Sequence, residues 1–474
     1  MILRPYQNLI LGQARDLMKS GIRSFIIEST PGSGKTVMTA AMVKTAVSRG
    51  IRCWFVMHRI ELVMQSMETF RDVGVEFGIV AAGFTPDPNA MVQICSVGTL
   101  ARRIKKLPAP GLVVWDECHH CAAKTYADIH AHHPNAFHVG LSGTPERLDG
   151  KGLGPYFKEI IHGPPPRWLI DNGFLAKYKM ATPPGINTDG VHRLGGDFNH
   201  AELAVVADVP TITGSAVREY IKRVPGKRAI ARGVNIHHSK DIVAQFNAAG
   251  VPSLHVDGKT PKPEREEAMR LFKSGNILVL SNVDLFSEGI NVPAAECVLD
   301  LRPTESLTLC LQFWYRAMRP SPGKEYATII DFAGNYRRHG LPCEPREWNL
   351  EGRKKKSKKT ATVINTECPV CYGVFIGSVS VCPDCGEDLS TARGGGRTVE
   401  HRDGELVEVD LEQARADREG KIAKWREIGA AKTLKDFQAL AVKYNYKSGW
   451  AYFRFRARNA KKKARPATEG EMSA

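Results

Sequence analysis

The sequence has no apolar run of the length that a membrane-spanning helix requires. No stretch approaches the roughly 18 apolar residues of such a span. The first residues, Met1–Gln7, also lack the apolar run of a secretory signal peptide. We therefore expect a soluble protein that has no membrane partner and that resides in a cytoplasm, either that of a bacterium or that of a phage-infected host cell.

The cysteines do not predict disulfide bonds. Their number, 11, is odd and no secretory segment accompanies them, whereas disulfide frameworks belong to oxidising compartments. The sequence also lacks the nucleophile elbow of the α/β-hydrolases, a dinucleotide-binding glycine fingerprint, a carboxylate pair of the glycosidase kind and any repeat of solenoid length. These absences argue against several classes of enzyme and against a repeat architecture.

Acidic residues are in deficit, with 50 Asp and Glu against 66 Lys and Arg, so the formal net charge is +16. A surplus of this size favours a polyanionic partner, and nucleic acid before a membrane surface. The length of 474 residues exceeds what one hydrophobic core supports, so we expect roughly two to four domains.

Short apolar, β-branched runs alternate with helical patterns in two successive blocks of the chain, and this alternation predicts parallel α/β sheets. The expected strands are Phe25–Ser29, Cys53–Met57, Val92–Ser96, Leu112–Asp116 and His138–Ser142, then Ala229–Val234, Ser253–Val256, Ile277–Ser281, Cys297–Leu301 and Ala327–Asp331. The expected helices are Lys35–Ser48, Ser239–Ala249, Glu264–Phe272 and Ser306–Met318.

The same pattern predicts the domain organisation. The expected parts are a first α/β domain (1–165), a connector (166–210), a second α/β domain (211–345), a basic linker (346–362), a cysteine module (363–390) and a charged helical tail (391–474). The tail contains aromatic residues and the basic run Arg454–Arg465. This run either binds a phosphate backbone beside stacked bases or belongs to a small helical domain with solvated charges.

The segment Ser29–Thr36 has the spacing of a phosphate-binding loop between a predicted strand and a predicted helix, with Ser29 where the general pattern has Gly. Its glycines let backbone N–H groups approach a phosphate without a clashing Cβ atom, and the helix N-terminus adds its dipole. The lysine of this pattern reaches the β- and γ-phosphates, and the threonine hydroxyl binds Mg²⁺. The predicted contacts of ATP and Mg²⁺ are Pro31, Gly32, Ser33, Gly34, Lys35 and Thr36.

The apolar run Val113–Trp115 ends in two carboxylates, Asp116 and Glu117. In a parallel sheet this end of a strand faces the ligand crevice. Phosphoryl transfer depends on a positioned metal ion and a positioned water molecule more than on a covalent intermediate. We therefore predict that Asp116 holds Mg²⁺ and that Glu117 activates the attacking water.

Two C-P-x-C knuckles lie near the C-terminus with ten residues between them. Each knuckle turns two thiolates toward one point, so the pair predicts a tetrahedral and structural zinc site. The module is too small to fold on a core alone, and metal binding would supply its stability. Two disulfides or an iron site are the alternatives. The predicted ligands are Cys368, Cys371, Cys382 and Cys385.

The run Asp116–His119 resembles the D-E-x-H box of the superfamily 2 helicases of the DEAD/DEAH-box kind, and further boxes follow in the order of that family. The resemblance implies two tandem RecA-like domains. The run Ser142–Thr144 of this chain, the S-G-T box, resembles the S-A-T box of the family and has Gly143 where Ala is common. The residues that the resemblance implies in the first domain are Gln7 for adenine, His58, Arg59 and Thr99 for nucleic acid, and Ser142, Thr144 and His119 for coupling hydrolysis to domain movement.

In the second block, Ser287–Pro293 resembles motif V, which implies that Gly289 contacts the nucleotide. Asn291 stands where many relatives have Asp. Asparagine lacks the negative charge of aspartate, so the polar role of Asp in this motif does not carry over directly to Asn291.

The run Gln312–Arg319 resembles the Q-x-x-G-R-x-x-R box, with Tyr315 in place of the usual Gly. The resemblance implies catalytic roles for Gln312, Arg316 and Arg319. The two arginines lie three residues apart on a predicted helix, so we expect them on one face. From there they could reach the γ-phosphate across the domain cleft, as an arginine finger does.

The runs Glu146–Leu153, Leu301–Ser306 and Ile330–Asn335 narrow the resemblance to the RadD/YejH-type DNA repair helicases and their phage-encoded relatives. This resemblance covers about residues 1–390. It implies an ATP-dependent DNA helicase or translocase that works on single-stranded or branched DNA, in repair or in phage replication and recombination. Single-strand-binding, repair or replication proteins are then the expected protein partners.

Other functions fit the same boxes. One is an RNA-dependent helicase of the same fold, and another is a motor that tracks along a duplex without unwinding it. A third, from a different class, is a nucleic-acid-binding scaffold that has lost ATP hydrolysis.

Overall fold

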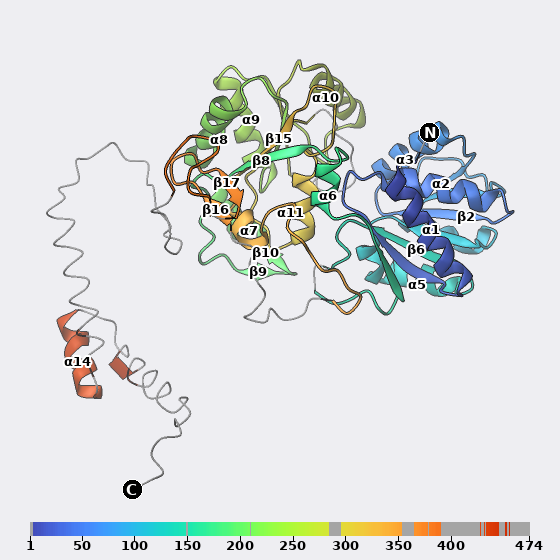
Figure 1. The fold of residues 1–474 in the computed structure, drawn as a ribbon, viewed down its shortest axis with the longest axis horizontal. Coiled ribbons are helices and arrows are strands. Elements are labelled where there is room, and N and C mark those ends of the chain that lie inside the picture. The colour runs from blue at the N-terminus through green and yellow to red at the C-terminus, as the bar shows by residue number, and fades with distance from the viewer. Residues whose placement is uncertain are drawn as a thin grey trace, which may run out of the picture. The chain divides into compact units, whose positions relative to one another are not determined.

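The computed structural model describes residues 3–147, 150–208, 210–283, 295–352, 365–377 and 379–389, together with 427, 431, 433–444, 451, 452 and 455. The chain divides into two compact units, residues 1–400 and 401–474. The first unit holds two α/β lobes and the cysteine module (Figure 1). The predicted motif V with Gly289, and the basic stretch Lys354–Lys359, lie outside the described residues.

The first lobe is built on a seven-stranded parallel sheet in the order β3-β4-β2-β5-β6-β1-β7. Its strands are β1 (Ser24–Glu28), β2 (Cys53–Met57), β3 (Gly78–Val80), β4 (Val92–Ser96), β5 (Leu112–Trp115), β6 (Phe137–Ser142) and β7 (Glu159–His162). Its helices are α1 (Pro5–Lys19), α2 (Lys35–Val47), α3 (Ile60–Val73), α4 (Val97–Arg103) and α5 (Lys124–His132). The predicted parallel sheet is confirmed, and β3 and β7 extend it at its edges.

The second lobe has a six-stranded parallel sheet in the order β12-β13-β11-β14-β15-β8. Its strands are β8 (Lys177–Ala181), β11 (Ala229–Arg232), β12 (Ser253–His255), β13 (Val279–Asn282), β14 (Cys297–Asp300) and β15 (Tyr326–Asp331). Its helices are α8 (Pro210–Arg223), α9 (Ile236–Ala248), α10 (Lys262–Ser274), α11 (Leu307–Trp314) and α12 (Asn335–His339). The second predicted α/β sheet is therefore confirmed.

The stretch expected as a connector is structured. It contains α6 (Pro166–Asp171), the hairpin of β9 (Arg193–Leu194) and β10 (Asp197–Phe198), and α7 (His200–Ala207). It also contributes β8, which pairs with β15 and so forms one edge of the second sheet. Residues 177–181 thus belong to the second lobe.

The helix predicted over Ser306–Met318 is shorter than expected, because α11 ends at Trp314. The N–H of Arg316 bonds three residues back, to the carbonyl of Phe313 at 3.1 Å, so the chain leaves the α-helical pattern there. The expectation that Arg316 and Arg319 share one face of a helix is therefore wrong. Both arginines lie on the turn that follows α11.

The cysteine module continues the second lobe at the edge strand β8. Its own strands, β16 (Asn365–Glu367) and β17 (Val374–Ile376), pair antiparallel. The N–H of Thr182, directly after β8, donates to the carbonyl of Tyr372 at 2.9 Å. The Lys179 ammonium lies 3.5 Å from the Asp384 carboxylate. The module therefore covers a sheet edge whose backbone groups need partners.

The described part of the C-terminal unit centres on α14 (Leu434–Lys443). Thr433 and Asp436 form a capping box, in which each side chain accepts from the backbone N–H of the other, at 3.2 and 2.8 Å. Phe437 and Leu440 are buried in a small apolar cluster. This piece of the predicted tail is helical, and most of the basic run lies outside the described residues.

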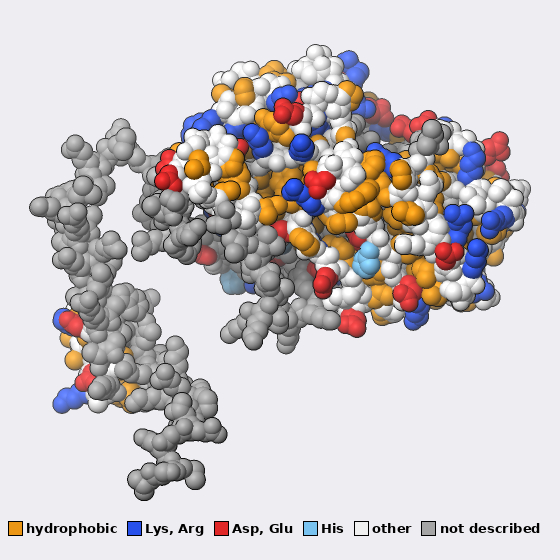
Figure 2. Space-filling view, in the orientation of Figure 1, with side chains coloured by type: hydrophobic (Ala, Val, Ile, Leu, Met, Phe, Trp, Pro, Cys, Tyr) orange, Lys and Arg blue, Asp and Glu red, His pale blue; other side chains and the backbone are white. Residues whose placement is uncertain are grey.

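Charged side chains of both signs are intermixed on the visible face of the molecule in Figure 2, so the basic surplus does not gather there in one patch. Among the helices that the structure describes, none combines the length and the apolar character needed to cross a bilayer.

A buried histidine lies in the core of the first lobe. His138 on β6 accepts at Nδ1 from Trp115 Nε1 at 3.2 Å, and its Nε2 lies 2.9 Å from the His133 carbonyl. These partners fit the neutral ring, because Nδ1 accepts while Nε2 donates. Burial lowers the pKa of His138 to about 4, and the stacked ring of His130 at 3.9 Å adds to the shift.

We predict that the free energy of unfolding falls as the pH drops from 6.5 toward 4, because the unfolded chain binds a proton at His138 that the folded lobe excludes. The difference in pKa corresponds to about 3 kcal/mol at most. Denaturant titrations of the wild type and of His138→Gln, whose amide still accepts and donates, measure this loss. The loss should be smaller in the variant, and equal dependence on pH in both proteins would contradict the prediction.

Candidate active site

The loop between β1 and α2 holds the residues predicted to bind phosphate, and two of its glycines have left-handed backbones. Gly34 has a φ of 87°, in the left-handed region that favours glycine. A Cβ atom at Gly34 would lie 2.6 Å from Gln7 Nε2, so a larger residue would displace the Gln7 amide. Inside the loop, the Ser33 hydroxyl donates to the Thr30 carbonyl at 2.6 Å and lies 2.5 Å from the Ser29 hydroxyl. Ser29, where the general pattern has Gly, thus braces the loop from within.

Helix α1 supports the same loop from outside. Gln7 Nε2 and the Tyr6 hydroxyl both donate to the Ser33 carbonyl, at 2.9 and 2.5 Å. Gln7 Oε1 accepts from the Arg4 N–H at 2.9 Å. The structure therefore brings the predicted adenine contact, Gln7, to the phosphate loop as a buried brace. Tyr6 was not predicted as a support of this loop. Its position directly before Gln7 is the feature of the sequence that could have indicated this role.

A line of polar contacts joins the loop to the ends of β5 and β6. Lys35 Nζ donates to Glu117 Oε1 at 3.1 Å, and Glu117 Oε2 lies 3.5 Å from His119 Nδ1. That nitrogen lies 3.3 Å from the Ser142 hydroxyl, which accepts from the Thr144 N–H at 3.1 Å. All five residues were singled out from the sequence, and the structure brings them together.

The acidic pair combines strain with burial. Glu117 has a φ of 46°, an uncommon value for a residue with a side chain, and such strain collects at functional sites. Burial, and after it the neighbouring Glu117 carboxylate, raise the pKa of Asp116 to about 6. Lys35 opposes both effects. A cation that binds the Asp116 carboxylate would therefore compete with a proton near neutral pH.

The second lobe contributes arginine to this loop. A Cβ atom at Gly32 would lie 3.2 Å from Leu175 Cδ2 and 3.5 Å from Arg319 Cγ. Burial lowers the pKa of Arg319 to about 10, so its guanidinium stays charged at neutral pH. Arg316 and Gln312 are buried close behind, at 4% and 3% exposure. Of the three predicted catalytic residues in this box, the structure brings Arg319 against the loop.

The predicted nucleic-acid contacts differ in accessibility. His58 and Arg59 follow β2 and are partly exposed, and the His58 ring lies 4.5 Å from that of His120. Thr99 is 5% exposed, and its hydroxyl accepts from the Ser96 hydroxyl at 3.1 Å. The structure therefore presents the first two side chains at the strand end and holds Thr99 inside the lobe.

Gly143 has a reason to be glycine. A Cβ atom there would lie 2.5 Å from Pro31 Cδ and 2.8 Å from Pro31 Cγ, which is closer than carbon atoms approach in proteins. The turn after β6 therefore packs directly against the phosphate loop. This contact links the S-G-T box to the loop without any polar group.

The four cysteines of the module lie at one point. Their sulfur atoms are all within 4.8 Å of one another, and none is in a disulfide. The Cys368–Cys385 and Cys371–Cys382 sulfur pairs lie 3.7 and 3.5 Å apart. Four thiol ligands so close together fit a single tetrahedral metal ion, and zinc is the ion that this donor set favours.

Residues 1–147 match the family described as type III restriction enzyme, res subunit, and residues 213–321 match the helicase conserved C-terminal domain. A 51.5 kDa protein of a Lactococcus phage is 34% identical over 435 residues, which are 90% of this chain and 93% of that protein. The chain belongs to the superfamily 2 helicases.

Other similar proteins are longer than this superfamily 2 helicase. A Saccharomyces cerevisiae protein named as an ATP-dependent helicase, IRC3, is 26% identical over 356 residues, 70% of this chain and 52% of that protein. The ATP-dependent type ISP restriction-modification enzyme LlaBIII, solved bound to DNA, shares the fold with a TM-score of 0.54 and 17% identity. That match covers 70% of this chain and 28% of LlaBIII.

We predict that Gly143→Ala lowers ATP turnover of this helicase by about tenfold, because the added methyl group must displace Pro31 and with it the phosphate loop. Steady-state kinetics measure the effect. Gly12→Ala on α1 is the control, since nothing lies within 4 Å of a Cβ atom there. Full turnover in Gly143→Ala would show that the contact is dispensable.

We predict one zinc ion per chain, and that Cys385→Ser releases it, because a serine hydroxyl is a poor zinc ligand at neutral pH. Cys385 is the exposed member of the four, so its replacement leaves the core intact. Elemental analysis of the purified wild type, of Cys385→Ser and of the control Ser380→Ala gives the stoichiometry. Equal zinc in all three proteins would rule out the site.

Proposed function

We propose that this superfamily 2 helicase couples ATP hydrolysis to movement along DNA or to its unwinding, as a RadD-type helicase of DNA repair or of phage replication and recombination. The observation that carries the proposal is the 3.1 Å contact between Lys35 and Glu117. A phosphate-binding lysine and a water-activating carboxylate are thereby within reach of one γ-phosphate. Arg319 from the other lobe packs against the same loop, which supports hydrolysis that responds to lobe movement.

The side chains divide the work of hydrolysis among them. Lys35 holds the β- and γ-phosphates, and Glu117 orients and deprotonates the attacking water. Asp116 and Thr36 hold Mg²⁺, since a carboxylate and a hydroxyl are the oxygen ligands that this ion prefers. When bound there, Mg²⁺ neutralises charge on the phosphate oxygens.

The arginine turn supplies the remaining charge. Arg316 and Arg319 stabilise the negative charge that develops on the transferred phosphoryl group, and Gln312 sits behind them on α11. Ser142, Thr144 and His119 connect the acidic pair to the turn after β6, so a change at the γ-phosphate reaches that turn.

DNA is the proposed substrate. LlaBIII, which shares the fold, was solved on DNA, and the net charge of +16 suits a polyanion. We expect His58 and Arg59, which follow β2 and are partly exposed, to contact its phosphates. In this proposal residues 1–165 and 211–345 are the two motor domains, and the four cysteines hold a structural zinc ion.

We predict that single-stranded or branched DNA stimulates ATP hydrolysis and that Lys35→Ala lowers turnover at least about 100-fold, because the β- and γ-phosphates lose their cation. Lys44→Ala is the matched control, since Lys44 lies on the same helix and is exposed. Steady-state hydrolysis is measured without nucleic acid and with single-stranded DNA, duplex DNA and RNA.

The possible outcomes of this measurement separate the proposed function from its alternatives. Unchanged turnover in Lys35→Ala would remove the proposed active site. Equal stimulation by RNA and DNA would reopen the choice of substrate, and stimulation by RNA alone would assign the RNA-dependent alternative. Absence of turnover on every substrate would assign the scaffold. Where DNA stimulates, a strand-displacement assay separates unwinding from tracking along a duplex.

A further inference from the structure

The turn that carries the arginines begins with an unusual residue. Tyr315 occupies the position where the Q-x-x-G-R-x-x-R box commonly has glycine. Glycine has more backbone freedom than any other residue, so at this position it leaves the turn flexible. Tyrosine restricts the backbone and adds a side chain that can be anchored. The chain uses that side chain, because Tyr315 is 2% exposed.

The anchor is a single hydrogen bond to a segment beyond α12. The Tyr315 hydroxyl donates to the Pro342 carbonyl at 2.8 Å. Burial raises the pKa of Tyr315 well above its usual range, so the hydroxyl keeps its proton at any working pH. The hydroxyl is therefore available as a donor to the Pro342 carbonyl at neutral pH.

The partner of this bond is itself fixed. We call residues 342–352 the strap. Arg346 donates from Nη1 to the carbonyl of Pro342 at 3.2 Å and of Glu344 at 3.0 Å, and from Nη2 to those of His339 and Leu341 at 3.0 and 2.9 Å. Four carbonyls held by one guanidinium make the start of the strap rigid.

The far end of the strap belongs to the first lobe. The Leu350 carbonyl accepts from the Gly154 N–H at 2.9 Å. A Cβ atom at Gly152 would lie 2.0 Å from that carbonyl oxygen, so the two backbones are in close contact. Lys151 and Gly352 pair as an antiparallel bridge. The strap therefore runs from the arginine turn to the segment that follows the S-G-T box.

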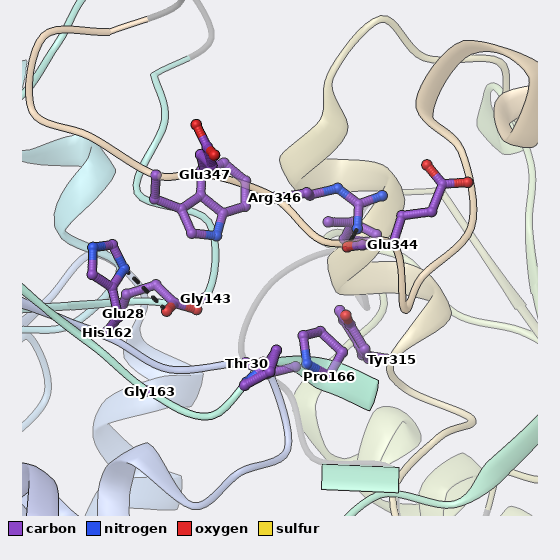
Figure 3. Close-up of a pocket in the computed structure, with 13 residues that line it drawn as sticks. Glu28, Thr30, Gly143, His162, Gly163, Pro166, Tyr315, Glu344, Arg346 and Glu347 are labelled. Atoms are coloured by element: carbon purple, nitrogen blue, oxygen red, sulfur yellow. Dashed lines mark hydrogen bonds and ion pairs between the residues drawn. The ribbon is translucent and has the colours of Figure 1, made fainter. Parts of the chain in front are cut away.

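Between these anchors lies a cavity of about 410 Å³ (Figure 3). Tyr315 and Arg346 line it from the side of the second lobe, and Thr30 and Gly143 line it from the side of the first. The arginine turn also has anchors within the second lobe, because Lys324 donates to the carbonyls of Ala317 and Arg319 at 3.0 and 2.8 Å. The Tyr315 bond differs from these in joining the turn to the strap, which reaches the first lobe.

We propose that Tyr315 is a positioning residue for the arginine finger: its hydroxyl fastens the arginine turn to the strap and so holds Arg316 and Arg319 toward the phosphate loop. This inference rests on the proposed ATPase function. A tethered turn brings charge to the transition state without first being ordered, and misplacement of such a group by about 1 Å can cost on the order of 100-fold in rate.

The test is Tyr315→Phe, which removes the hydroxyl and keeps the ring. We expect the DNA-stimulated kcat to fall about tenfold while the KM for ATP stays within about twofold, because the loss is confined to the transition state. The melting temperature should hardly change, since the Pro342 carbonyl keeps Arg346 as a donor. Tyr220→Phe is the matched control: its buried hydroxyl donates to the Lys227 carbonyl at 2.6 Å in the same lobe.

A second variant separates positioning from general destabilisation. Because Tyr315 acts through the arginines, the combined loss in single-turnover rate of Tyr315→Phe with Arg319→Ala should be smaller than the product of the two separate losses, and the remaining effect of Tyr315→Phe should come from Arg316. Wild-type kcat in Tyr315→Phe, equal losses in Tyr315→Phe and Tyr220→Phe, or full additivity with Arg319→Ala would each overturn the proposal. Absence of ATP turnover in the wild type would instead remove the proposed function itself.

Discussion

The order of three parallel strands decides where the reactive groups of this protein meet. β5, β6 and β1 are neighbours in the first sheet, and parallel strands bring their carboxyl ends to one edge. The acidic pair after β5, the turn after β6 and the phosphate loop after β1 are therefore adjacent before any side chain makes contact. The Lys35–Glu117 ion pair is a consequence of this order.

A buried ion pair in the second lobe holds the helix that precedes the arginine turn. Arg232 on β11 and Asp300 on β14 form an ion pair at 2.8 Å with both side chains inaccessible to solvent. Removing two charges from water is expensive, so such a pair persists where further hydrogen bonds satisfy it. Trp314 and Asn335 donate to Asp300 at 3.0 Å each, and Arg232 donates to the Leu309 carbonyl at 3.2 Å. The network holds α11, and therefore the start of the arginine turn, in one place on the sheet.

Features that depend on residues close together in the sequence could be predicted, whereas features that depend on contacts between distant residues could not. The two sheets and the cysteine cluster follow from local runs and spacings, and these predictions are confirmed. The strand, loop and helix around Lys35 are also present, while the binding of phosphate by this loop stays a prediction. β8 was missed because its pattern, Lys-Tyr-Lys-Met-Ala, is half polar at a sheet edge. The end of α11 was missed because distant residues such as Pro342 hold the turn that follows it. The place of Gln7 against Ser33 likewise depends on the packing of α1, which spacing does not reveal.

Two kinds of link join the lobes, an ion pair and covalent connections of the chain. Their difference in strength constrains how the lobes can move. Arg265 of α10 meets Glu61 of α3 at 3.0 Å, with both side chains partly exposed. Such a pair contributes little, about 0–1 kcal/mol, and can break and reform with each cycle. The chain itself also joins the lobes, and within the described residues it does so through α6 and through the strap. If the lobes separate at the α3–α10 contact, these connections remain, so the distance between Arg319 and the phosphate loop would change while the Tyr315–Pro342 bond keeps the arginine turn on the strap.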